Sequence, residues 1–252
     1  MDVSVILSTY NATDWLEKVV WGYSVQSYRQ FELIIADDGS MEETAQLIGQ
    51  LRRKTGLDIR HVWHEDLGFR KCTILNRAVE AASGDYLIFS DGDCIPRWDF
   101  VARHVEAARP RCLLSGGCVR LPMAPSKRIT VDDVVQRRAT DPRWLYARGL
   151  RDRKWQLRLV SGRTLAQLLD ALTTTRATWN GCNASTWKSH VVEINGYDER
   201  MGYGGLDREL GERLVNAGVR PIQVRFRAVL VHLDHARGYV RRDTWQANTA
   251  LR

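Results

Sequence analysis

The chain has 252 residues, of which 44% are hydrophobic and 27% are charged, and its formal net charge is +7. These values are ordinary for a soluble globular protein, and the length allows one large α/β domain or a nucleotide-binding half with a smaller second half. No uncharged apolar stretch approaches the length of a membrane span, and nothing before the apolar run at 3–7 resembles a signal peptide.

The first hundred residues alternate between strand and helix patterns. Buried strands are expected at 3–8, 31–36, 58–63 and 86–90. Helices are expected between them at 15–25, 42–54 and 73–82. Strands that are apolar throughout and separated by helices indicate a parallel sheet with both faces covered, so we predict a Rossmann-like α/β fold.

The second half is less regular. We expect a strand at 113–121, in which Gly116 and Gly117 form a bulge or a close backbone approach. The stretch 126–172 is mostly polar and basic and should form helices or a long excursion. Beyond it we expect a turn leading into a helix at 181–192, an amphipathic helix at 206–218, and a strand pair or extended segment at 219–231.

The chain contains five cysteines. Their number is odd and no Cys-x-x-Cys pair occurs. This usage favours reduced thiols in a cytoplasmic protein over a disulfide scaffold or a zinc site.

Polar side chains gather where three of the expected strands end. These clusters are Ser8-Thr9-Tyr10, Asp37-Asp38 and Asp91-Gly92-Asp93. Ligands of open parallel sheets bind at the carboxyl ends of the strands, so three polar ends on one edge indicate a site for a polar ligand.

Asp91 and Asp93 are close enough to raise each other's pKa unless a cation neutralises them. A hard divalent cation prefers carboxylate oxygen and can also stabilise a departing diphosphate. Gly92 would let the backbone pass close to the ligand. The alternative interpretation of this triplet is a simple Asp-Gly turn.

Several motifs in order make a more specific pattern than the triplet alone. The stretch 3–100 resembles the inverting GT-A glycosyltransferases of family 2. The matching segments are VILSTYN at 5–11, DDGS at 37–40, EDLGFRK at 65–71, LNRA at 75–78 and GDYLIFSDGDCIP at 84–96. The resemblance implies a GT-A fold: a mostly parallel sheet flanked by helices, with a C-terminal acceptor-binding region.

The C-terminal part resembles a galactosyltransferase-type region. The matching segments are NGCNASTW at 180–187, NGYDE at 195–199, GGLD at 204–207 and HLDH at 232–235. We therefore divide one continuous domain into a nucleotide-sugar-binding part at 1–121, a basic, helical insertion at 122–178 and an acceptor-binding and catalytic part at 179–252.

The resemblance implies a UDP-sugar donor and a divalent metal ion. Nucleotide-sugar contacts are implied for Thr9, Tyr10, Asp37 or Asp38, Arg70, Lys71, Asn76, Asp91 and Gly92. Asp93 would be the direct metal ligand, and His235, or alternatively His232, would complete the site. Imidazole ligation favours manganese (Mn2+) over magnesium (Mg2+).

On the acceptor side, the resemblance implies that Asp207 is the general base. In an inverting transfer, one carboxylate takes the proton of the acceptor hydroxyl as that oxygen attacks the anomeric carbon. Asp198 and Glu199 are alternatives for this role. Acceptor contacts are implied for Asn183, Trp187, Asp198, Glu199, Gly205 and Leu206. Related enzymes usually carry Glu where this chain has Leu206, which puts the acceptor contact in doubt.

The net charge is concentrated in 137–163, which holds nine Arg or Lys residues and two Asp residues. Aromatic residues are interleaved with these arginines. This pattern fits a peripheral contact with an anionic membrane at the inner face of the cell membrane, a lipid-diphosphate-linked acceptor or an anionic glycan, or simply a solvated helix surface. No nucleic-acid-binding motif accompanies the charge, so no nucleic-acid partner is expected.

These features predict an enzyme of the hexosyltransferase type, with a glycan or lipid-linked glycan as acceptor. The resemblance alone suggests bacterial surface polysaccharide or lipopolysaccharide synthesis. Leu206 motivates one alternative, a catalytically degenerate glycan- or membrane-binding protein on the same scaffold. A sugar nucleotidyltransferase would need a glycine-rich phosphate loop after the first strand, which the sequence at 10–13 does not provide.

Overall fold

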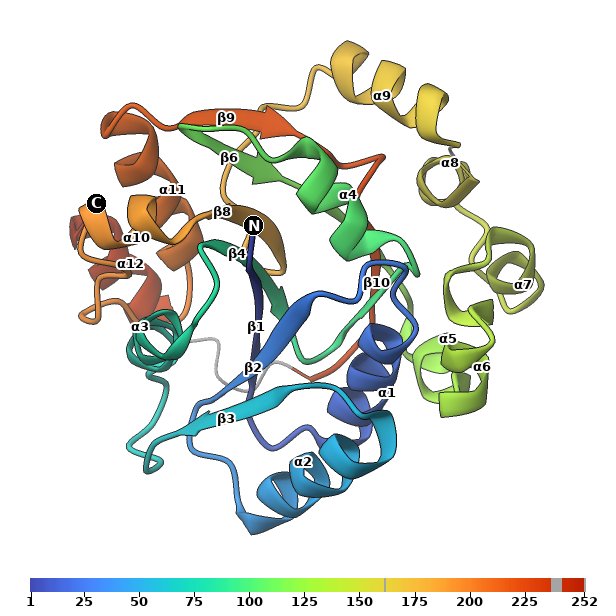
Figure 1. Ribbon diagram of the computed structural model, residues 1–252, viewed down its shortest axis with the longest axis horizontal. Helices are drawn as coiled ribbons and strands as arrows, with labels where there is room; N and C mark the ends of the chain where they lie inside the picture. Colours follow the sequence, from blue (N-terminus) through green and yellow to red (C-terminus); the bar gives the residue numbers. More distant parts are fainter. Residues whose placement is uncertain (161, 237–241, 252) are drawn as a thin grey trace.

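The computed structural model describes residues 1–160, 162–236 and 242–251. Within these residues the strands form two sheets, one with seven strands and one with three (Figure 1). The large sheet has the order β3 (Ile59–Trp63), β2 (Phe31–Asp37), β1 (Val3–Thr9), β4 (Tyr86–Asp91), β8 (Asn183–Trp187), β6 (Cys112–Ser115) and β9 (Arg220–Gln223). The small sheet has the order β5 (Cys94–Pro96), β10 (Val229–His232) and β7 (Gly117–Arg120).

Helices lie between many of these strands. In the first half they are α1 (Thr13–Ser24), α2 (Glu42–Thr55), α3 (Lys71–Ala81) and α4 (Phe100–Ala107). A run of short helices follows: α5 (Met123–Arg128), α6 (Val131–Val135), a 3₁₀ turn at Arg138–Thr140, α7 (Pro142–Ala147), α8 (Arg153–Val160) and α9 (Arg163–Leu172). The last helices are α10 (Lys188–Glu193), α11 (Leu206–Asn216) and α12 (Arg242–Leu251).

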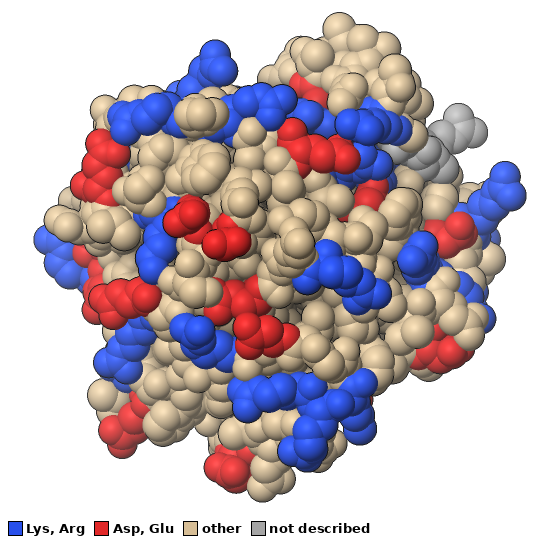
Figure 2. Space-filling model, in the orientation of Figure 1, with Lys and Arg blue, Asp and Glu red and all other residues tan. Residues whose placement is uncertain are grey.

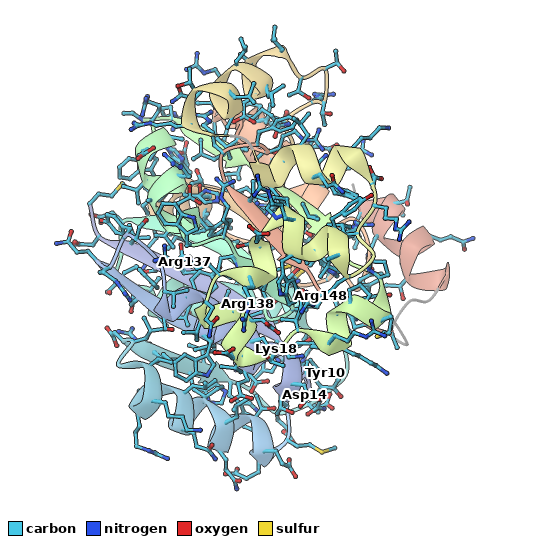
Figure 3. All side chains as sticks on the ribbon, turned by 90° about the vertical axis from the view of Figure 1, so that its right-hand side faces the viewer. Tyr10, Asp14, Lys18, Arg137, Arg138 and Arg148 are labelled. Carbon is cyan, nitrogen blue, oxygen red and sulfur yellow. The ribbon has the colours of Figure 1, made fainter. Side chains whose placement is uncertain are left out.

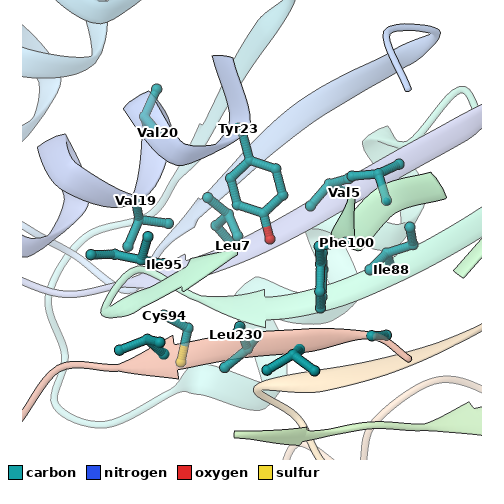
Figure 4. Close-up of a cluster of buried hydrophobic side chains, with 14 of the residues drawn as sticks. Val5, Leu7, Val19, Val20, Tyr23, Ile88, Cys94, Ile95, Phe100 and Leu230 are labelled. Carbon is teal, nitrogen blue, oxygen red and sulfur yellow. The ribbon is translucent and has the colours of Figure 1, made fainter. Parts of the chain in front are cut away.

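The centre of the large sheet is parallel, as the sequence predicts. β1 pairs in parallel with β2 on one side and with β4 on the other. Alternate side chains of β1 then enter two different cores. Val5 and Leu7 pack with Tyr23 of α1 and Phe100 of α4 (Figure 4), whereas Ile6 joins a cluster on the opposite face with residues of α3 and α11. Both faces are covered, which explains the continuous apolar character of these strands.

The segment 181–192 differs from the expectation. A strand, β8, lies between the turn and the helix, and it pairs antiparallel with both β4 and β6. Its sequence, NASTW, has little apolar character, so the pattern did not indicate a buried strand. The polar side chains are tolerated because they satisfy one another: Tyr86 Oη and Ser185 Oγ lie 2.8 Å apart, and Ser185 Oγ lies 2.7 Å from Nδ1 of His104.

The strand expected at 113–121 is divided between the two sheets. β6 and β7 are separated by Gly116. A Cβ atom at Gly116 would lie 2.0 Å from Asn183 Oδ1, so the side chain of Asn183 leaves room only for glycine. The close backbone approach predicted for these glycines is therefore present. The strand pair expected at 219–231 is also present, as β9 in the large sheet and β10 in the small one.

The polar and basic stretch forms the short helices α5 to α9, along the side of the molecule shown at the right of Figure 1. On the face drawn in Figure 2, basic side chains form a band along the upper edge, where β9 lies, and the part formed by α5 to α8 carries both signs. Basic side chains thus also lie outside the segment 137–163 on this face, although the rest of the chain has no net charge.

Candidate active site

The carboxyl ends of β1 and β4 open into a cavity of about 970 Å³. The strand register places Thr9 opposite Asp37 and Ser8 opposite Asp91, so the three polar strand ends do meet at one edge. The lining includes several residues that the sequence assigned to a donor, an acceptor or a metal ion: Thr9, Tyr10, Asp38, Lys71, Asp91, Gly92, Asp93, Gly205, Leu206, Asp207, His232 and His235. One cavity therefore joins the N-terminal and C-terminal motifs.

Asp91 is held in place by two donors. Ser8 Oγ donates to Asp91 Oδ1 at 2.6 Å, and Lys71 Nζ lies 2.7 Å from the same oxygen. Burial lowers the pKa of Lys71, but the carboxylates of Asp91 and Asp207 outweigh this effect and hold the pKa above its ordinary value. Lys71 is thus a fixed positive charge between two carboxylates.

Gly92 lets the chain turn tightly beside β1. Its backbone N–H donates to the carbonyl of Ser8 at 2.8 Å. A Cβ atom at this position would lie 3.1 Å from that carbonyl oxygen and 3.2 Å from Thr9 Oγ1, a hydroxyl that is buried and has no hydrogen-bond partner among the described residues. A side chain here would crowd the end of β1.

Asp93 faces two histidines from the far end of the chain. Its Oδ2 lies 2.9 Å from Nε2 of His235 and 3.6 Å from Nε2 of His232, and the two imidazole rings stack at 5.6 Å. The pairing of β10 with β5 brings them together, since His232 stands opposite Cys94. Burial tends to raise the pKa of Asp93, but the hydrogen bond from His235 and the charge of His232 prevail and lower it.

This arrangement fits a divalent cation. One carboxylate oxygen lies near an imidazole nitrogen of each histidine, and both groups are common ligands of transition metal ions. The Cys94 sulfur lies within 4.8 Å of the ligand atoms of Asp93 and His232, but burial raises the pKa of Cys94 and keeps it a neutral thiol. Asp93 with His235 and His232 would therefore hold the ion, with His235 the nearer histidine.

Asp207 lies on the opposite wall, in the first turn of α11. Gly204 and Gly205 precede the helix with φ values of 105° and 84°, a left-handed region that favours glycine. Burial and, to a smaller degree, the charge of Asp91 raise the pKa of Asp207 to about 6, against the lowering effect of Lys71 and the backbone N–H of Gly181. Asp207 Oδ1 is buried without a hydrogen-bond partner among the described residues. It is a carboxylate poised to accept a proton.

Gly181 shapes the approach to this carboxylate. A Cβ atom at Gly181 would lie 2.3 Å from Asp207 Oδ1, so only glycine fits beside this carboxylate. Leu206, in contrast, is 5% exposed and packs in the same apolar cluster as Leu210. The position that usually carries a carboxylate in related enzymes is here a core residue that also lines the cavity.

The two aspartates after β2 have different surroundings. Asp38 lines the cavity and receives hydrogen bonds from His64 Nε2 at 2.8 Å and from the backbone N–H of Arg70 at 3.1 Å. Burial nevertheless raises the pKa of Asp38. Asp37 is fully buried, accepting from the backbone N–H of Ser40 and lying 2.9 Å from His61 Nε2. Of the pair, Asp38 is the one in the cavity.

Seven residues assigned to ligand contacts do not line the cavity, and two of them form the frame around it. Asn76 donates to the carbonyl of Tyr197 and to Glu199. Arg70 donates from its side chain to the carbonyl of Glu65. The other five are Asp37, Asn183, Trp187, Asp198 and Glu199.

Asn183 and Trp187 belong to β8. Asn183 is fully buried and donates to the carbonyls of Gly117 and Ala228. Trp187 stands opposite Tyr86, at the end of β4 away from Asp91, and its indole N–H donates to the carbonyl of Arg109. Asp198 pairs with Arg200, and Glu199 accepts from Thr73. The assignment of these four residues to acceptor contacts stays a prediction, and none of the four lines the cavity.

Asp66 is a cavity residue to which the sequence interpretation gave no role. Tyr10 Oη donates to Asp66 Oδ2 at 2.8 Å, and the backbone N–H of Gly68 donates to Oδ1. These hydrogen bonds lower the pKa of Asp66. Its place after β3, the next strand in the sheet beyond β2, is the signal that could have found it, because the end of β3 points to the same edge.

In the described part of the chain the five cysteines are free thiols. Cys118 and Cys182 line the cavity together with Asn180 and Arg120, none of which had an assigned role. In the described part of the chain, no helix is long and apolar enough to span a membrane.

Comparisons with known proteins agree with this geometry. The sequence model described as "Glycosyl transferase family 2" matches residues 4–172, two thirds of the chain. The chain belongs to glycosyl transferase family 2. A second model, described as "N-terminal domain of galactosyltransferase", matches residues 173–236. Both resemblances inferred from the motifs are thereby confirmed.

Curated relatives cover the chain to different extents. The validoxylamine A glucosyltransferase of Streptomyces hygroscopicus subsp. jinggangensis is 26% identical over 249 residues, which are 93% of this chain and 56% of the relative. A putative teichuronic acid biosynthesis glycosyltransferase of Bacillus subtilis is 36% identical over 105 residues, which are 41% of this chain and 40% of the relative. The chain spans about half or less of the length of these relatives.

Solved structures share the fold. A mannosyltransferase from Pyrobaculum calidifontis, in complex with GDP-Man and Mn2+, superposes with a TM-score of 0.61 and 22% identity over 94% of this chain and 58% of its own. S. aureus TarS 1–349, in complex with UDP-GlcNAc, superposes with a TM-score of 0.60 and 16% identity. The match covers 95% of this chain and 60% of the TarS chain. The predicted GT-A architecture of a mostly parallel sheet flanked by helices is confirmed.

Proposed function

We propose that this family 2 member is an inverting glycosyltransferase that moves a sugar from a UDP-sugar to a glycan or lipid-linked glycan acceptor. The observation that carries the proposal is one cavity with the Asp93, His232 and His235 cluster on one wall and Asp207, with its pKa raised to about 6, on another. A metal-type cluster suits a diphosphate, and a weakly basic carboxylate suits an acceptor hydroxyl.

The proposed chemistry follows from the groups in place. A divalent ion held by Asp93 and the histidines would neutralise charge on the leaving diphosphate. Asp207 accepts the proton of the acceptor hydroxyl while its oxygen forms a bond to the anomeric carbon. The bond from that carbon to the phosphate oxygen breaks, and its electron pair leaves with the nucleoside diphosphate. No second carboxylic acid is needed, in contrast to a glycoside hydrolase.

Other residues would orient the donor. Lys71 keeps its positive charge beside Asp91, so it fixes that carboxylate where a ribose or donor-sugar hydroxyl could donate to it. Asp38 and Tyr10 line the part of the cavity reached from β1 and β2. Thr9 Oγ1, which has no partner among the described residues, is available for a ligand oxygen.

Release of nucleoside diphosphate tests the proposal against a binding-only protein. A panel of UDP-sugars and GDP-sugars would be incubated with the chain and manganese, and nucleotide release would be quantified by chromatography. We expect slow release from at least one UDP-sugar, lost on chelation of the metal and in Asp93→Ala. The GDP-sugars are included because one structural neighbour holds GDP-Man. Absence of release across the panel, with nucleotide binding retained, would favour the binding-only alternative suggested by Leu206.

We also propose a peripheral contact with an anionic membrane through 137–163. Arg137 and Arg148 lie with Lys18 on the side of the molecule that also shows Tyr10 and Asp14, two residues of the cavity lining (Figure 3). Arg148 lies 3.4 Å above the Trp144 ring, a combination suited to a membrane surface.

Co-sedimentation tests this contact. We expect binding to vesicles containing phosphatidylglycerol, weaker binding to pure phosphatidylcholine, and a loss in Arg137→Gln with Arg148→Gln. Arg53→Gln with Lys54→Gln, on the exposed side of α2, serves as the charge-matched control. Equal binding by both variants would contradict the assignment of this segment.

A further inference from the structure

A second cavity of about 370 Å³ adjoins the first. The two share Cys118, Arg120 and Asn180 in their linings, so a ligand could extend from one into the other. Asn180 directly precedes Gly181, the residue in contact with Asp207. The second cavity therefore begins beside the candidate base.

Four arginines from separate parts of the chain line this second cavity. They are Arg120 at the end of β7, Arg158 in α8, Arg176 in the connection from α9 to β8, and Arg225 in the turn between β9 and β10. The lining contains no Asp or Glu. In the described part of the chain, no carboxylate forms an ion pair with any of the four.

Other arginines in this fold do form ion pairs with carboxylates. Arg227, two residues beyond Arg225, pairs with Asp170 at 2.7 Å, and Arg97 pairs with Asp99 at 2.6 Å. These two buried or half-buried arginines thus have acidic partners. The arginines of the second cavity lack them, although they lie close to one another.

Arg158 and Arg225 are held against the protein rather than free in solvent. Arg158 Nη1 donates to the carbonyl of Cys118 at 3.0 Å, and its guanidinium lies 4.6 Å from the centre of the Trp155 ring. Burial and then the charge of Arg225 lower the pKa of Arg158. Arg225 Nε is buried without a hydrogen-bond acceptor among the described residues. Unpaired buried donors and like charges are unfavourable unless an anion satisfies them.

Gly117 makes this proximity possible. A Cβ atom there would lie 3.2 Å from Arg225 Cβ and 3.5 Å from Arg158 Nη1. A side chain would occupy the space between the two arginines. The bare backbone leaves it open, lined by donors that match a planar or tetrahedral oxyanion.

We propose that the second cavity binds an anionic group of the acceptor, a carboxylate or a phosphate, and thereby orients the neighbouring hydroxyl toward Asp207. This inference rests on the proposed glycosyl transfer. It differs from the membrane contact, which uses the outward-facing arginines of the segment 137–163, whereas Arg158 faces inward. It makes the acceptor an acidic or phosphorylated saccharide rather than a neutral one.

Calorimetric titration of the full chain with three small probes tests the inference. Glucuronate carries a carboxylate, glucose 6-phosphate carries a phosphate, and glucose is the neutral match. We expect at least one charged sugar to bind about tenfold or more tightly than glucose, with an affinity that falls as salt is added. Equal affinity for all three sugars would overturn the proposal. The stronger of the two charged probes identifies the anionic group.

Variants locate the binding. Arg158→Gln, Arg225→Gln and Arg176→Gln should each weaken the charged sugar about tenfold, while Arg53→Gln should not change its affinity. Arg176 is exposed, so its substitution leaves the fold intact, and melting curves check the other two. Unchanged affinity in all three variants, or displacement of the sugar by UDP, would place the anion elsewhere and contradict the inference.

Binding of UDP with manganese separates the two proposals. The arginine variants should bind UDP as the parent chain does, because the second cavity lies beyond the donor residues. If the parent chain bound the charged sugar but not UDP, the anion site would stand while the proposed glycosyl transfer would fail. If the parent chain bound UDP but no charged sugar, the proposed glycosyl transfer would stand while the anion site would fail.

Discussion

The proposed donor side and the proposed acceptor side of the cavity are built in different ways. On the donor side, β1, β2 and β4 are mostly apolar strands, and the polar residues of the cavity appear where these strands end. On the acceptor side, the buried strand β8 is polar, and Asp207 stands on a helix that begins after two left-handed glycines. The first wall follows from strand register alone, whereas the second depends on loops and on a hydrogen-bond network.

The polar network of β8 shows what this difference requires. His104 Nε2 lies 3.0 Å from Asn183 Oδ1, and His104 Nδ1 lies 2.7 Å from Ser185 Oγ. Burial lowers the pKa of His104 to about 4, so the ring is neutral and links the two side chains as one donor and one acceptor. The acceptor side is therefore supported by directional bonds between α4, β8 and the backbones of β7 and the turn before β10.

The largest effect is expected from the base. Asp207→Asn keeps the shape of the side chain but cannot accept the proton, so sugar transfer should fall by about 10³-fold, within the range of general-base catalysis. Binding of UDP with manganese should not change. Initial rates with a saturating donor measure the effect. A loss of less than about tenfold would move the base to another residue, with Asp198 and Glu199 the remaining candidates.

A smaller effect, on stability rather than activity, is expected in the frame. Asn183→Ala removes two donors to backbone carbonyls and the acceptor of His104, and should lower the free energy of unfolding by about 3 kcal/mol. Urea denaturation measures this loss. Asn216→Ala, at the exposed end of α11, is the control and should change little. A stable Asn183→Ala protein with weakened acceptor binding would instead restore Asn183 as an acceptor contact.

The smallest expected effect is a dependence of the protein's stability on pH, which arises from Asp207. The pKa of Asp207 is raised from 3.8 to about 6, so its ionisation destabilises the folded state, and this cost appears as the pH rises through that range. Asp207→Asn should therefore be more stable than the parent chain by about 1–3 kcal/mol at neutral pH. The difference in stability between the two proteins should vanish below pH 3.8, the lower of the two pKa values. Unfolding curves at acidic and neutral pH test this sign, and a variant that is less stable at neutral pH would contradict the buried carboxylate.

The contrast also explains what the sequence could predict. The parallel core and the edge formed by Thr9, Asp38 and Asp91 follow from apolar runs that end in polar residues. β8 could not be recognised, because Asn183 and Ser185 become compatible with burial only when His104, distant in sequence, supplies their partners. Asp66 lies three residues beyond the end of β3 rather than directly at it, so the strand-end pattern did not mark it.

The second cavity lay outside any sequence pattern. Its arginines come from 120, 158, 176 and 225, and only folding brings them together. The cluster of Asp93 with His235 was inferred from a resemblance, and the pairing of β10 with β5 provides its physical basis. The predicted division of the chain at 121 and 178 stays a prediction.

Calorimetric titration of UDP in the presence of manganese tests most directly that one cavity has a nucleotide wall and a separate base wall. The account predicts that the parent chain and Asp207→Asn bind UDP with the same affinity, and that Asp93→Ala loses about tenfold or more of it. UDP affinity that is unchanged in Asp93→Ala, or lost in Asp207→Asn, would contradict the account.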